Sequence, residues 1–589
     1  MNEEIPENFI EVSFEVANKV GGIHQVLKSK ASTMDRYYDG DYLTIGFYNE
    51  ESAREEFSPR DCPFQDVLDE IDNSTGVKCR YGVWNVPSTP RCILVDISEM
   101  EKPVDEIKKE MWERQDIDSM NAGNDFDEPV KWAYAAGLVV NRLLKQNEGE
   151  TVVQLHEWLS APAMFNFDAP TVFTTHATVL GRTLSNSDYD LRHAVEDGQV
   201  DDYLAEKYGV KAKHQVEKFG ARAADVLTTV SETTGREAEA VLDRKPGQIL
   251  PNGFNVEEYP SLEELSYNHK KKKQEMKEFL RAYFEPYHDI NIEDDPRILF
   301  ISGRYEFHNK GIDLLIDSLS RLNSRKGDEF FVFFFVPSDV KGPRQEVLDN
   351  MSLYDELEDH VEDVIPEVRS KVISSIAGGM DPVEQIRPLL DSDTLDALQR
   401  HFHKKSGSPP VSAFDLNYSQ DEITETLEEK GLTNDPEDRV KVVFYPTYLS
   451  VGDKLLSMDY NDAIVASSAG IFPSYYEPWG YTPVETAANG ALSVTTDLAG
   501  FGQFLLENTS EEDREGIKVL NRRERSDDEA AGELADIIDE IIGYSKTEIT
   551  ERKHNARKLA QMTSWTELGE NYRKAHSKAL ENYRDEKVT

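Results

Sequence analysis

The chain has 589 residues, of which 112 are acidic and 65 are basic, so its formal net charge at pH 7 is −47. This charge argues against nucleic acid or an anionic membrane surface as a partner, because both would repel the chain. The three cysteines, Cys62, Cys79 and Cys92, form no Cys-x-x-Cys pair, and an odd number suits a reducing compartment.

No apolar run approaches the roughly 18 residues that a membrane-spanning helix needs. The first residues are acidic and lack the basic and apolar regions of a signal peptide, so we expect a cytoplasmic protein. The charge also indicates a high-salt cytoplasm, because at molar salt the Debye length of about 3 Å screens the self-repulsion of such a chain. An ordinary acidic soluble protein is the alternative.

The first predicted element is a strand over Phe9–Val16, followed by the loop Asn18–Gly22 and a helix from Ile23. A glycine pair at such a junction lets a ligand approach the backbone closely, although it marks any tight turn as well. The sequence contains no Gly-x-Gly-x-x-Gly, which counts against a dinucleotide-binding site.

Short apolar runs separated by helical segments continue this pattern. They predict strands at residues 41–48, 81–86, 92–95, 152–155, 171–175 and 226–230. Such alternation favours a parallel, doubly wound sheet, in which ligands bind at the carboxyl ends of the strands. His156 and His176 each follow a strand, although a structural histidine is the default interpretation for each of them. A turn at Asn252 and Gly253 closes this lobe.

A polar, lysine-rich stretch at residues 260–295 comes next, and we interpret Lys270–Lys273 as a solvated helix face rather than a nucleic-acid patch. A second lobe then begins with a buried strand at Arg297–Ile301. Arg304 and Lys310 lie in the following turn, where two cations can hold a diphosphate, although a chance surface pair is common. Residues 341–439 are acidic and helical, and we interpret them as an insertion into this lobe.

The apolar run Ala463–Phe472 predicts a buried strand, and Pro473, Pro478 and Gly480 then impose a turn before a helix. A strand-turn-helix of this kind points free backbone N–H groups and a positive dipole end at a bound phosphate. Glu477 and Glu485 flank the turn, and such carboxylates are natural acceptors for sugar hydroxyls. Two exposed glutamates in an acidic chain are the alternative. Residues 526–583 are helical by periodicity.

Four motifs carry a resemblance to a known family. Tyr-Tyr-Glu-Pro-Trp-Gly-Tyr-Thr-Pro at 475–483, followed by a second glutamate, resembles the donor-site signature of glycogen synthases of the animal and fungal type. Segments 15–22, 174–182 and 303–311 are similar to further motifs of these enzymes, and the resemblance runs from about Glu11 to about Leu580. It implies a GT-B fold, which consists of two Rossmann-like doubly wound lobes that face a central cleft.

The resemblance also implies the division of the chain. We expect a first lobe over residues 1–285, joined by the last helix at about 570–589, and a second lobe over 286–569 that binds the donor. The family has a helical insertion comparable to residues 341–439 and uses it in subunit contacts, so we expect a homo-oligomer.

The family implies catalytic roles for Glu477, which orients the glucose ring, for His176 beside the donor sugar, and for Arg304 and Lys310 on the leaving diphosphate. It implies substrate contacts for Lys19, Gly21, Gly22, His156, Arg182, Asn252, Tyr460, Trp479, Gly480, Tyr481, Thr482 and Glu485. In this assignment Tyr460 stacks on uracil and Glu485 holds the ribose. We expect no cofactor and no metal, because cations replace the metal and no cluster has ligand spacing.

The resemblance therefore implies a retaining enzyme that transfers glucose from a nucleotide sugar, UDP-glucose, to the 4-hydroxyl at the non-reducing end of an α-1,4-glucan. The alternatives are a related GT-B enzyme with another donor or acceptor, or a catalytically silent glucan-binding protein. In one place the match weakens. The arginine-rich helix that binds glucose 6-phosphate in the family aligns with Lys546–Leu559. Of its basic pattern this stretch retains only Arg552, Lys553, Arg557 and Lys558, which puts activation by this sugar phosphate in doubt.

Overall fold

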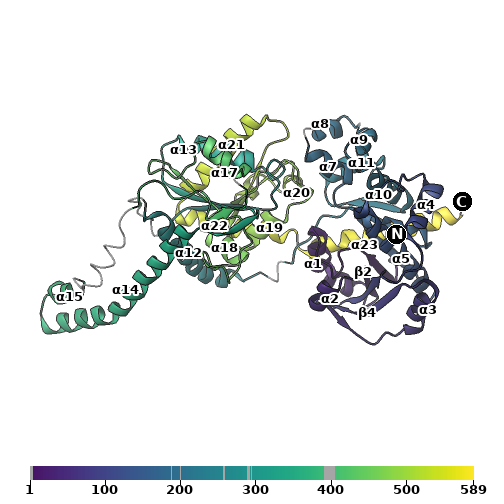
Figure 1. Cartoon of the computed structure of the whole chain (residues 1–589), viewed down its shortest axis with the longest axis horizontal. Helices are drawn as coiled ribbons and strands as arrows, with labels where there is room; N and C mark the ends of the chain where they lie inside the picture. The colour runs from purple at the N-terminus through teal and green to yellow at the C-terminus, as the bar shows by residue number, and fades with distance from the viewer. Residues whose placement is uncertain are drawn as a thin grey trace.

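The computed structural model describes residues 4–187, 189–198, 200–255, 259–287, 292, 295–390, 405–418 and 420–588. It consists of two α/β lobes that lie side by side, with the N-terminal part of the chain in one lobe and most of the rest in the other (Figure 1). Among the described residues, no helix combines the length and the apolar character that a bilayer crossing requires.

The first lobe is built on a nine-stranded sheet with the order β3-β4-β5-β2-β1-β6-β7-β8-β9. Its strands are β1 (Asn8–Val12), β2 (Tyr42–Phe47), β3 (Phe57–Pro59), β4 (Lys78–Trp84), β5 (Arg91–Asp96), β6 (Thr151–His156), β7 (Thr171–Thr175), β8 (Val226–Thr229) and β9 (Gln248–Ile249). Apart from the antiparallel pairings of β4 with β3 and β5, all pairings are parallel. The parallel strands follow the doubly wound order, which reverses direction between β1 and β6.

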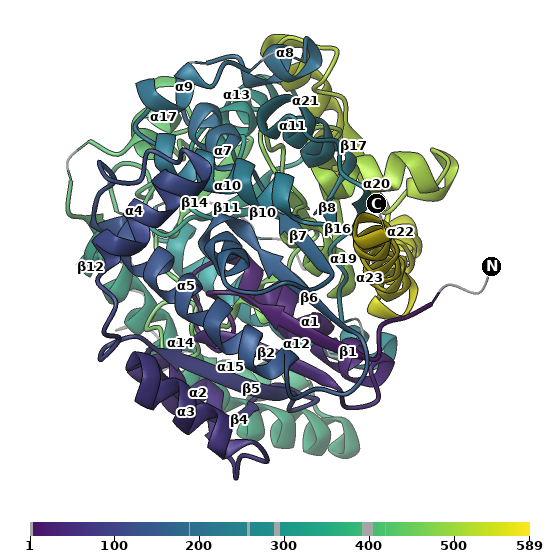
Figure 2. The same cartoon turned by 90° about the vertical axis from the view of Figure 1, so that its right-hand side faces the viewer.

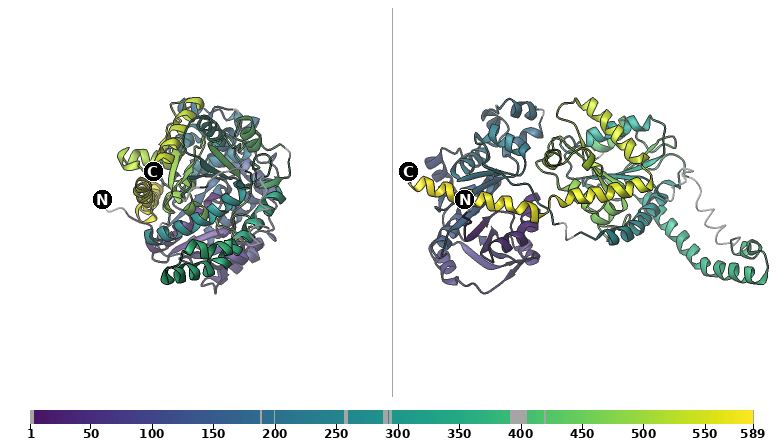
Figure 3. Two further views of the ribbon diagram at one scale, coloured as in Figure 1. Left: turned by 90° about the vertical axis from the view of Figure 1, so that its left-hand side faces the viewer. Right: turned by 180° about the vertical axis from the view of Figure 1, so that it is seen from behind.

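Helices cover both faces of this sheet (Figure 2). They are α1 (Gly22–Tyr37), α2 (Glu50–Glu56), α3 (Gln65–Thr75), α4 (Val104–Gln115), α5 (Asn124–Leu144), α6 (Glu157–Ser160), α7 (Val179–Ser185), α8 (Leu191–Glu196), α9 (Tyr203–Lys207), α10 (Lys211–Ala223) and α11 (Glu232–Leu242). The last helix, α23 (Trp565–Val588), packs beside α1, so the C-terminal end of the chain returns to the first lobe, as the view from behind shows (Figure 3).

The second lobe contains a six-stranded, wholly parallel sheet with the order β14-β11-β10-β15-β16-β17. Its strands are β10 (Ile298–Ser302), β11 (Phe330–Phe335), β14 (Val440–Phe444), β15 (Ala469–Ile471), β16 (Leu492–Thr496) and β17 (Ile517–Leu520). The helices around it are α12 (Leu262–Phe284), α13 (Ile312–Asn323), α17 (Glu422–Glu429), α18 (Tyr460–Ala466), α19 (Tyr481–Ala488), α20 (Gly500–Asn508), α21 (Asp527–Gly543) and α22 (Lys546–Gln561). The order of the strands reverses between β10 and β15, and ligands bind at such switch points.

Two expectations differ from this architecture. The boundary at residue 285 places α12 in the first lobe, but Met276, Phe279 and Leu280 of α12 lie in the core of the second lobe. The apolar run Ala463–Phe472, expected as one strand, is divided between the end of α18 and the short strand β15. Apolar runs of this length do not distinguish a buried strand from a buried helical segment, which explains the error.

The insertion between β11 and β14 contains the strands β12 (Val340–Pro343) and β13 (Phe414–Leu416), which pair with each other and lie before and after its two long helices in the chain. Its helices α14 (Gln345–Gly378) and α15 (Pro382–Leu390) form an arm that projects from the lobe (Figure 1). The arm carries exposed apolar side chains, including Ile373 at 59% and Ile376 at 68% exposure. By contrast, α17 packs against α13 and belongs to the body of the lobe.

Candidate active site

The switch point of the second lobe brings together two residues that are far apart in the sequence. Lys310 follows β10 and Glu477 follows β15, and the Lys310 Nζ atom lies 2.5 Å from the Glu477 Oε2 atom. Their side chains are 17% and 18% exposed, so the pair lies at the edge of solvent rather than within the core. Adjacent parallel strands account for this meeting, because β10 pairs directly with β15.

The two loops approach each other through their backbones. Gly311, with φ of +69°, precedes α13, and a Cβ atom at this position would lie 2.0 Å from the carbonyl oxygen of Pro473. The carbonyl oxygen of Asn309 accepts hydrogen bonds from the amides of Tyr475 at 2.9 Å and Tyr476 at 3.2 Å. The position of Lys310 is therefore fixed to the turn that carries Glu477.

Arg304 lies in the same loop as Lys310, but its side chain is 70% exposed and pairs with Glu306 at 2.9 Å. Next to Glu477, Gly480 has φ of +103° and precedes α19 without a side-chain cap, which leaves the first amides of the helix, at Tyr481 and Thr482, for an anion. The ring of Trp479 is buried against Phe501 and Phe504, which gives this ring a packing role.

Tyr460 and Glu485 lie beside this site. The Tyr460 Oη atom is 2.7 Å from the Oγ atom of Ser302, the last residue of β10. Burial raises the pKa of Glu485 to about 7. Burial also raises the pKa of Tyr460, and the charge of Glu485 adds to this effect, so the two side chains are neighbours. The arrangement is suited to an aromatic base and the hydroxyls of an attached ribose.

In the first lobe the glycine loop lies at the corresponding switch point, after β1. The Glu15 Oε2 atom accepts hydrogen bonds from the amides of Gly21 at 2.8 Å and His24 at 2.9 Å. The start of α1 is thus held by a carboxylate of the chain itself. Lys19 and Gly22 are exposed, and a Cβ atom at Gly22 would meet no atom within 4 Å, so this position is open to a ligand.

His156 at the end of β6 and His176 after β7 are in contact, with the His156 Nδ1 atom 3.0 Å from the His176 Nε2 atom. Behind them, the His156 Nε2 atom lies 2.8 Å from the Glu11 Oε1 atom. Glu157 accepts a hydrogen bond from the backbone amide of His176 at 2.9 Å. Glu157 has φ of +64°, a strained conformation for a residue with a side chain, and such strain is concentrated at functional sites.

Arg182, on α7, lies among carboxylates. Although burial lowers the pKa of its guanidinium, the charges of Glu157, Glu217 and Glu237 raise it overall. Burial raises the pKa of both Glu217 and Glu237. The charges of Glu157 and Glu237 add to the rise for Glu217, whereas the charge of Arg182 opposes the rise for Glu237. The structure thus places Arg182 as the counter-charge of a buried carboxylate cluster beside His176.

The carboxyl ends of the two sheets face each other. This follows from the contacts that the turn around Glu477 makes with the first lobe. The Tyr476 hydroxyl donates to Glu237 Oε1 at 3.2 Å, and the Ser231 hydroxyl donates to the Pro478 carbonyl at 2.8 Å. Tyr481 donates to the Gly253 carbonyl at 3.3 Å. A cavity of about 70 Å³ beside Glu477 is lined by both lobes.

Asn252 is the remaining residue of the expected set. It is 4% exposed, and its Oδ1 atom is buried without a hydrogen-bond partner in the described part of the chain. An unpaired buried acceptor costs free energy, so such an atom is expected to meet a ligand or water.

The family model for glycogen synthase matches residues 11–589. The chain belongs to this family. It is 32% identical to the glycogen [starch] synthase of Neurospora crassa over 97% of this chain and 83% of the relative. It is 31% identical to the human liver glycogen [starch] synthase over 98% of this chain and 84% of the relative.

Among solved structures, the N-terminal domain of trehalose-6-phosphate phosphatase from Candida albicans has a TM-score of 0.50, with 9% identity and 97% of each chain covered. The catalytic domain of starch synthase IV from Arabidopsis thaliana, bound to ADP and acarbose, has a TM-score of 0.48 with 13% identity, and covers 98% of this chain and 99% of that chain. The two doubly wound lobes of the structure, joined by contacts between their facing edges, confirm the GT-B fold expected for this glycogen synthase family member.

Several residues of the site were missed in the sequence. Asn309 is 2% exposed and donates to Asn186 Oδ1 of the first lobe at 2.7 Å, beside Lys310. Glu11 lies inside an otherwise apolar strand, and this acidic residue in a buried run is a signal that could have been used. Glu237 gave no signal, and although Tyr476 belongs to the motif at 475–483, its contact with Glu237 joins segments that are 239 residues apart.

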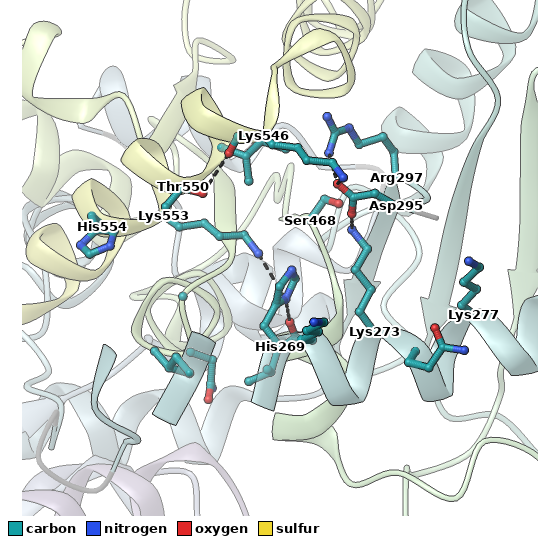
Figure 4. A pocket seen from close by; sticks show the side chains of 17 residues that line it. His269, Lys273, Lys277, Asp295, Arg297, Ser468, Lys546, Thr550, Lys553 and His554 are labelled. Carbon is teal, nitrogen blue, oxygen red and sulfur yellow. Dashed lines mark hydrogen bonds and ion pairs between the residues drawn. The ribbon is translucent and has the colours of Figure 1, made fainter. Parts of the chain in front are cut away.

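A second cavity, of about 440 Å³, lies away from this site, between α12 and α22 (Figure 4). Its walls are rich in basic side chains, namely His269, Lys270, Lys273, Lys277, Arg297, Lys546, Lys553 and His554. Burial lowers the pKa of Lys553 to about 7, and nearby cations contribute. Of Lys270–Lys273, expected on a solvated face, Lys273 is instead buried and pairs with Asp295.

The contact of Gly311 with Pro473 yields a test. Gly311→Ala should lower the unfolding temperature and the activity, because the new Cβ atom forces the Lys310 loop away from Glu477. Gly379→Ala is the matched control, since Gly379 has φ of +68° but a Cβ atom there would meet nothing within 4 Å. The free energy of unfolding of Gly379→Ala should fall only by the cost of a left-handed backbone, about 1–2 kcal/mol. That of Gly311→Ala should fall by about 1–3 kcal/mol more, because the site is crowded. Equal losses in both variants would contradict the close approach.

Proposed function

We propose that the protein is a glycogen synthase that transfers glucose from UDP-glucose to the non-reducing 4-hydroxyl of an α-1,4-glucan. The single observation that carries the proposal is the Lys310–Glu477 pair at the switch point of the second lobe. The pair combines a cation for a departing diphosphate with a carboxylate for sugar hydroxyls, and the turn that holds it touches the first lobe.

In this proposal the uracil stacks on Tyr460 and the ribose hydroxyls donate to Glu485. Lys310, Arg304 and the amides at the start of α19 stabilise the charge that develops on the diphosphate. Arg304 leaves its exposed contact with Glu306 to do so. On the first lobe, Lys19, Gly22 and Arg182 border the donor, and Asn252 offers its unpaired oxygen.

Glu477 orients the glucose ring while the bond from C1 to the diphosphate breaks. The acceptor hydroxyl attacks C1 from the face that the diphosphate leaves, its proton passes to the departing phosphate oxygen, and the configuration is retained. Lobe closure precedes this step, because the groups come from both lobes and water must be excluded.

The proposal is tested by glucose incorporation into glycogen from UDP-glucose and from ADP-glucose, measured in molar KCl. Incorporation from UDP-glucose should predominate. Glu477→Ala and Arg304→Ala should each lower the rate at least ~100-fold, the scale of one preorganised electrostatic group. Near-normal turnover in either variant would reject its assigned role, and a folded wild type without transfer from either donor would favour a silent glucan-binding protein.

The raised pKa of Glu485 predicts a pH dependence. Ribose hydroxyls donate to the carboxylate, so donor binding lowers the pKa from about 7 and requires loss of the proton. The affinity for UDP-glucose should therefore fall as the pH drops below about 7, by up to about tenfold per pH unit. Titration calorimetry from pH 5 to 8 measures this effect, which Glu485→Gln should abolish. An unchanged slope in Glu485→Gln would refute the assignment.

We also propose that the second cavity binds a phosphate-bearing anion, with glucose 6-phosphate as the candidate from the family resemblance. The doubt about glucose 6-phosphate rested on the basic residues of α22 alone. Two of them have partners within the protein, since Arg557 donates to the Ala488 carbonyl at 3.2 Å and Arg552 lies over the ring of Tyr544. Of the basic residues that line the cavity, Lys546, Lys553 and His554 come from α22, and the others come from α12 and from Arg297 just before β10. A bound anion would favour the charged form of Lys553, whose pKa burial otherwise lowers.

This site predicts binding of glucose 6-phosphate and inorganic phosphate that weakens as the pH rises through about 7, where Lys553 loses its proton. Lys553→Met should reduce the affinity about tenfold or more, the scale of one charge-assisted hydrogen bond. Lys558→Met, an exposed lysine on the same helix, is the control and should bind normally. Affinity that rises with pH, or equal losses in both variants, would argue against an anion held by Lys553.

The remaining proposals concern the setting of the enzyme. The net charge of −47 suits a cytoplasm rich in salt, because salt screens the repulsion between the acidic side chains of the chain. The exposed apolar side chains along α14 and α15 support contact with a second copy of the chain, and hence a homo-oligomer.

A further inference from the structure

We propose that Glu11 and His156 form a buried relay that holds His176 in one neutral tautomer, with its Nε2–H bond directed at His156. Glu11 and His156 are positioning residues in this scheme, because they act through His176. The catalytic consequence of the relay rests on the proposed function, whereas the relay itself does not.

The relay begins with an ionised carboxylate. Glu11, on β1, is fully buried and is contacted by the Lys30 ammonium group, the Tyr42 hydroxyl and His156. Burial alone would raise the pKa of Glu11, but Lys30 and His156 together lower it to about 2. An ionised carboxylate only accepts hydrogen bonds, so the Nε2 atom of His156 must carry the proton that it donates across 2.8 Å.

The state of His156 decides that of His176. Burial and the charge of Lys30 lower the pKa of His156 against the opposing effect of Glu11, so the ring is neutral at pH 7. A neutral imidazole with a proton on Nε2 has a lone pair on Nδ1. This Nδ1 atom lies 3.0 Å from the Nε2 atom of His176, which must therefore be the donor.

His176 is then fixed in two ways. Its ring donates through Nε2, and its backbone amide donates to Glu157 at 2.9 Å. Burial, with the charges of Lys30 and Arg182, lowers the pKa of His176, so the ring carries no positive charge. A neutral ring with a free Nδ1 lone pair suits a site where positive charge develops on the sugar, which an imidazolium would oppose.

His156 is not available to the substrate in this arrangement, since both of its ring nitrogens have partners within the protein. In place of the expected substrate contact, His156 thus positions His176, which faces the substrate. The same geometry explains why a charged pair is retained in the core, where it is expensive to bury.

The test compares two buried histidines of the first lobe. His156→Gln should lower kcat about 10- to 100-fold, the scale reported for the partners that orient an active-site ligand, with KM for UDP-glucose nearly unchanged. His576→Gln is the matched control, because His576 is also fully buried but bonds to Tyr38 and Gln154 instead. Equal losses of kcat in both variants would mean that the relay serves only packing.

A second measurement does not depend on activity. NMR spectra that record two-bond ¹H–¹⁵N couplings in ¹⁵N-histidine-labelled protein report the tautomer of each ring. The signals are assigned by their loss in His156→Gln and His176→Ala. Both rings should be neutral and protonated on Nε2 at pH 7. A proton on His176 Nδ1, or an imidazolium at either position, would overturn the proposal. A wild type that shows the relay but transfers no glucose would refute the proposed function alone.

A double variant covers the case in which His156→Gln fails to fold. Glu11→Gln combined with Lys30→Met removes the buried charges together, so neither is left unpaired. We expect a folded protein in which His156 loses its preference for a proton on Nε2 and kcat falls as in His156→Gln. Retention of the Nε2 tautomer and of full kcat in this variant would contradict the role of Glu11.

Discussion

The structure depends on one turn that belongs to one lobe and is anchored in the other. The Glu477 carboxylate is held by Lys310 of its own lobe. Its neighbour Tyr476 reaches across to Glu237, and Tyr481 reaches Gly253. The position of Glu477 is therefore a property of the assembled lobes, and any motion that separates the lobes also changes the surroundings of this carboxylate.

Strand order explains why both lobes offer a site at their facing edges. Among the parallel strands of each sheet the order reverses once, between β1 and β6 in the first lobe and between β10 and β15 in the second. Loops on either side of a reversal run in opposite directions and leave a crevice. The glycine loop and His156 flank the first crevice, and Lys310 and Glu477 flank the second.

Electrostatics divides the molecule into contrasting regions. The surface must carry most of a net charge of −47, yet the first lobe buries Lys30 and Glu11 together and surrounds Arg182 with glutamates. The cavity between α12 and α22 gathers cations in an acidic protein. Buried charges of this kind persist where they are paired or where they serve a ligand, because desolvation is otherwise too costly.

The sequence by itself determined the α/β character, the family and the loops that carry the expected site residues, whereas the ion pair of Lys310 with Glu477 was seen only in the structure. Short-range patterns encode these features, since an apolar run, a glycine turn and a helical periodicity in sequence specify a strand-turn-helix unit without distant contacts. It did not determine the boundary at α12, the division of residues 463–472 between helix and strand, or the packing of Trp479. These were decided by which apolar surfaces meet in the folded chain. The sequence also gave no sign of the contact of Tyr476 with Glu237. For the hydrogen-bonded series Glu11–His156–His176, the one signal was the acidic Glu11 within a buried strand. Both join segments more than a hundred residues apart, and only the tertiary structure brings such groups within hydrogen-bonding distance.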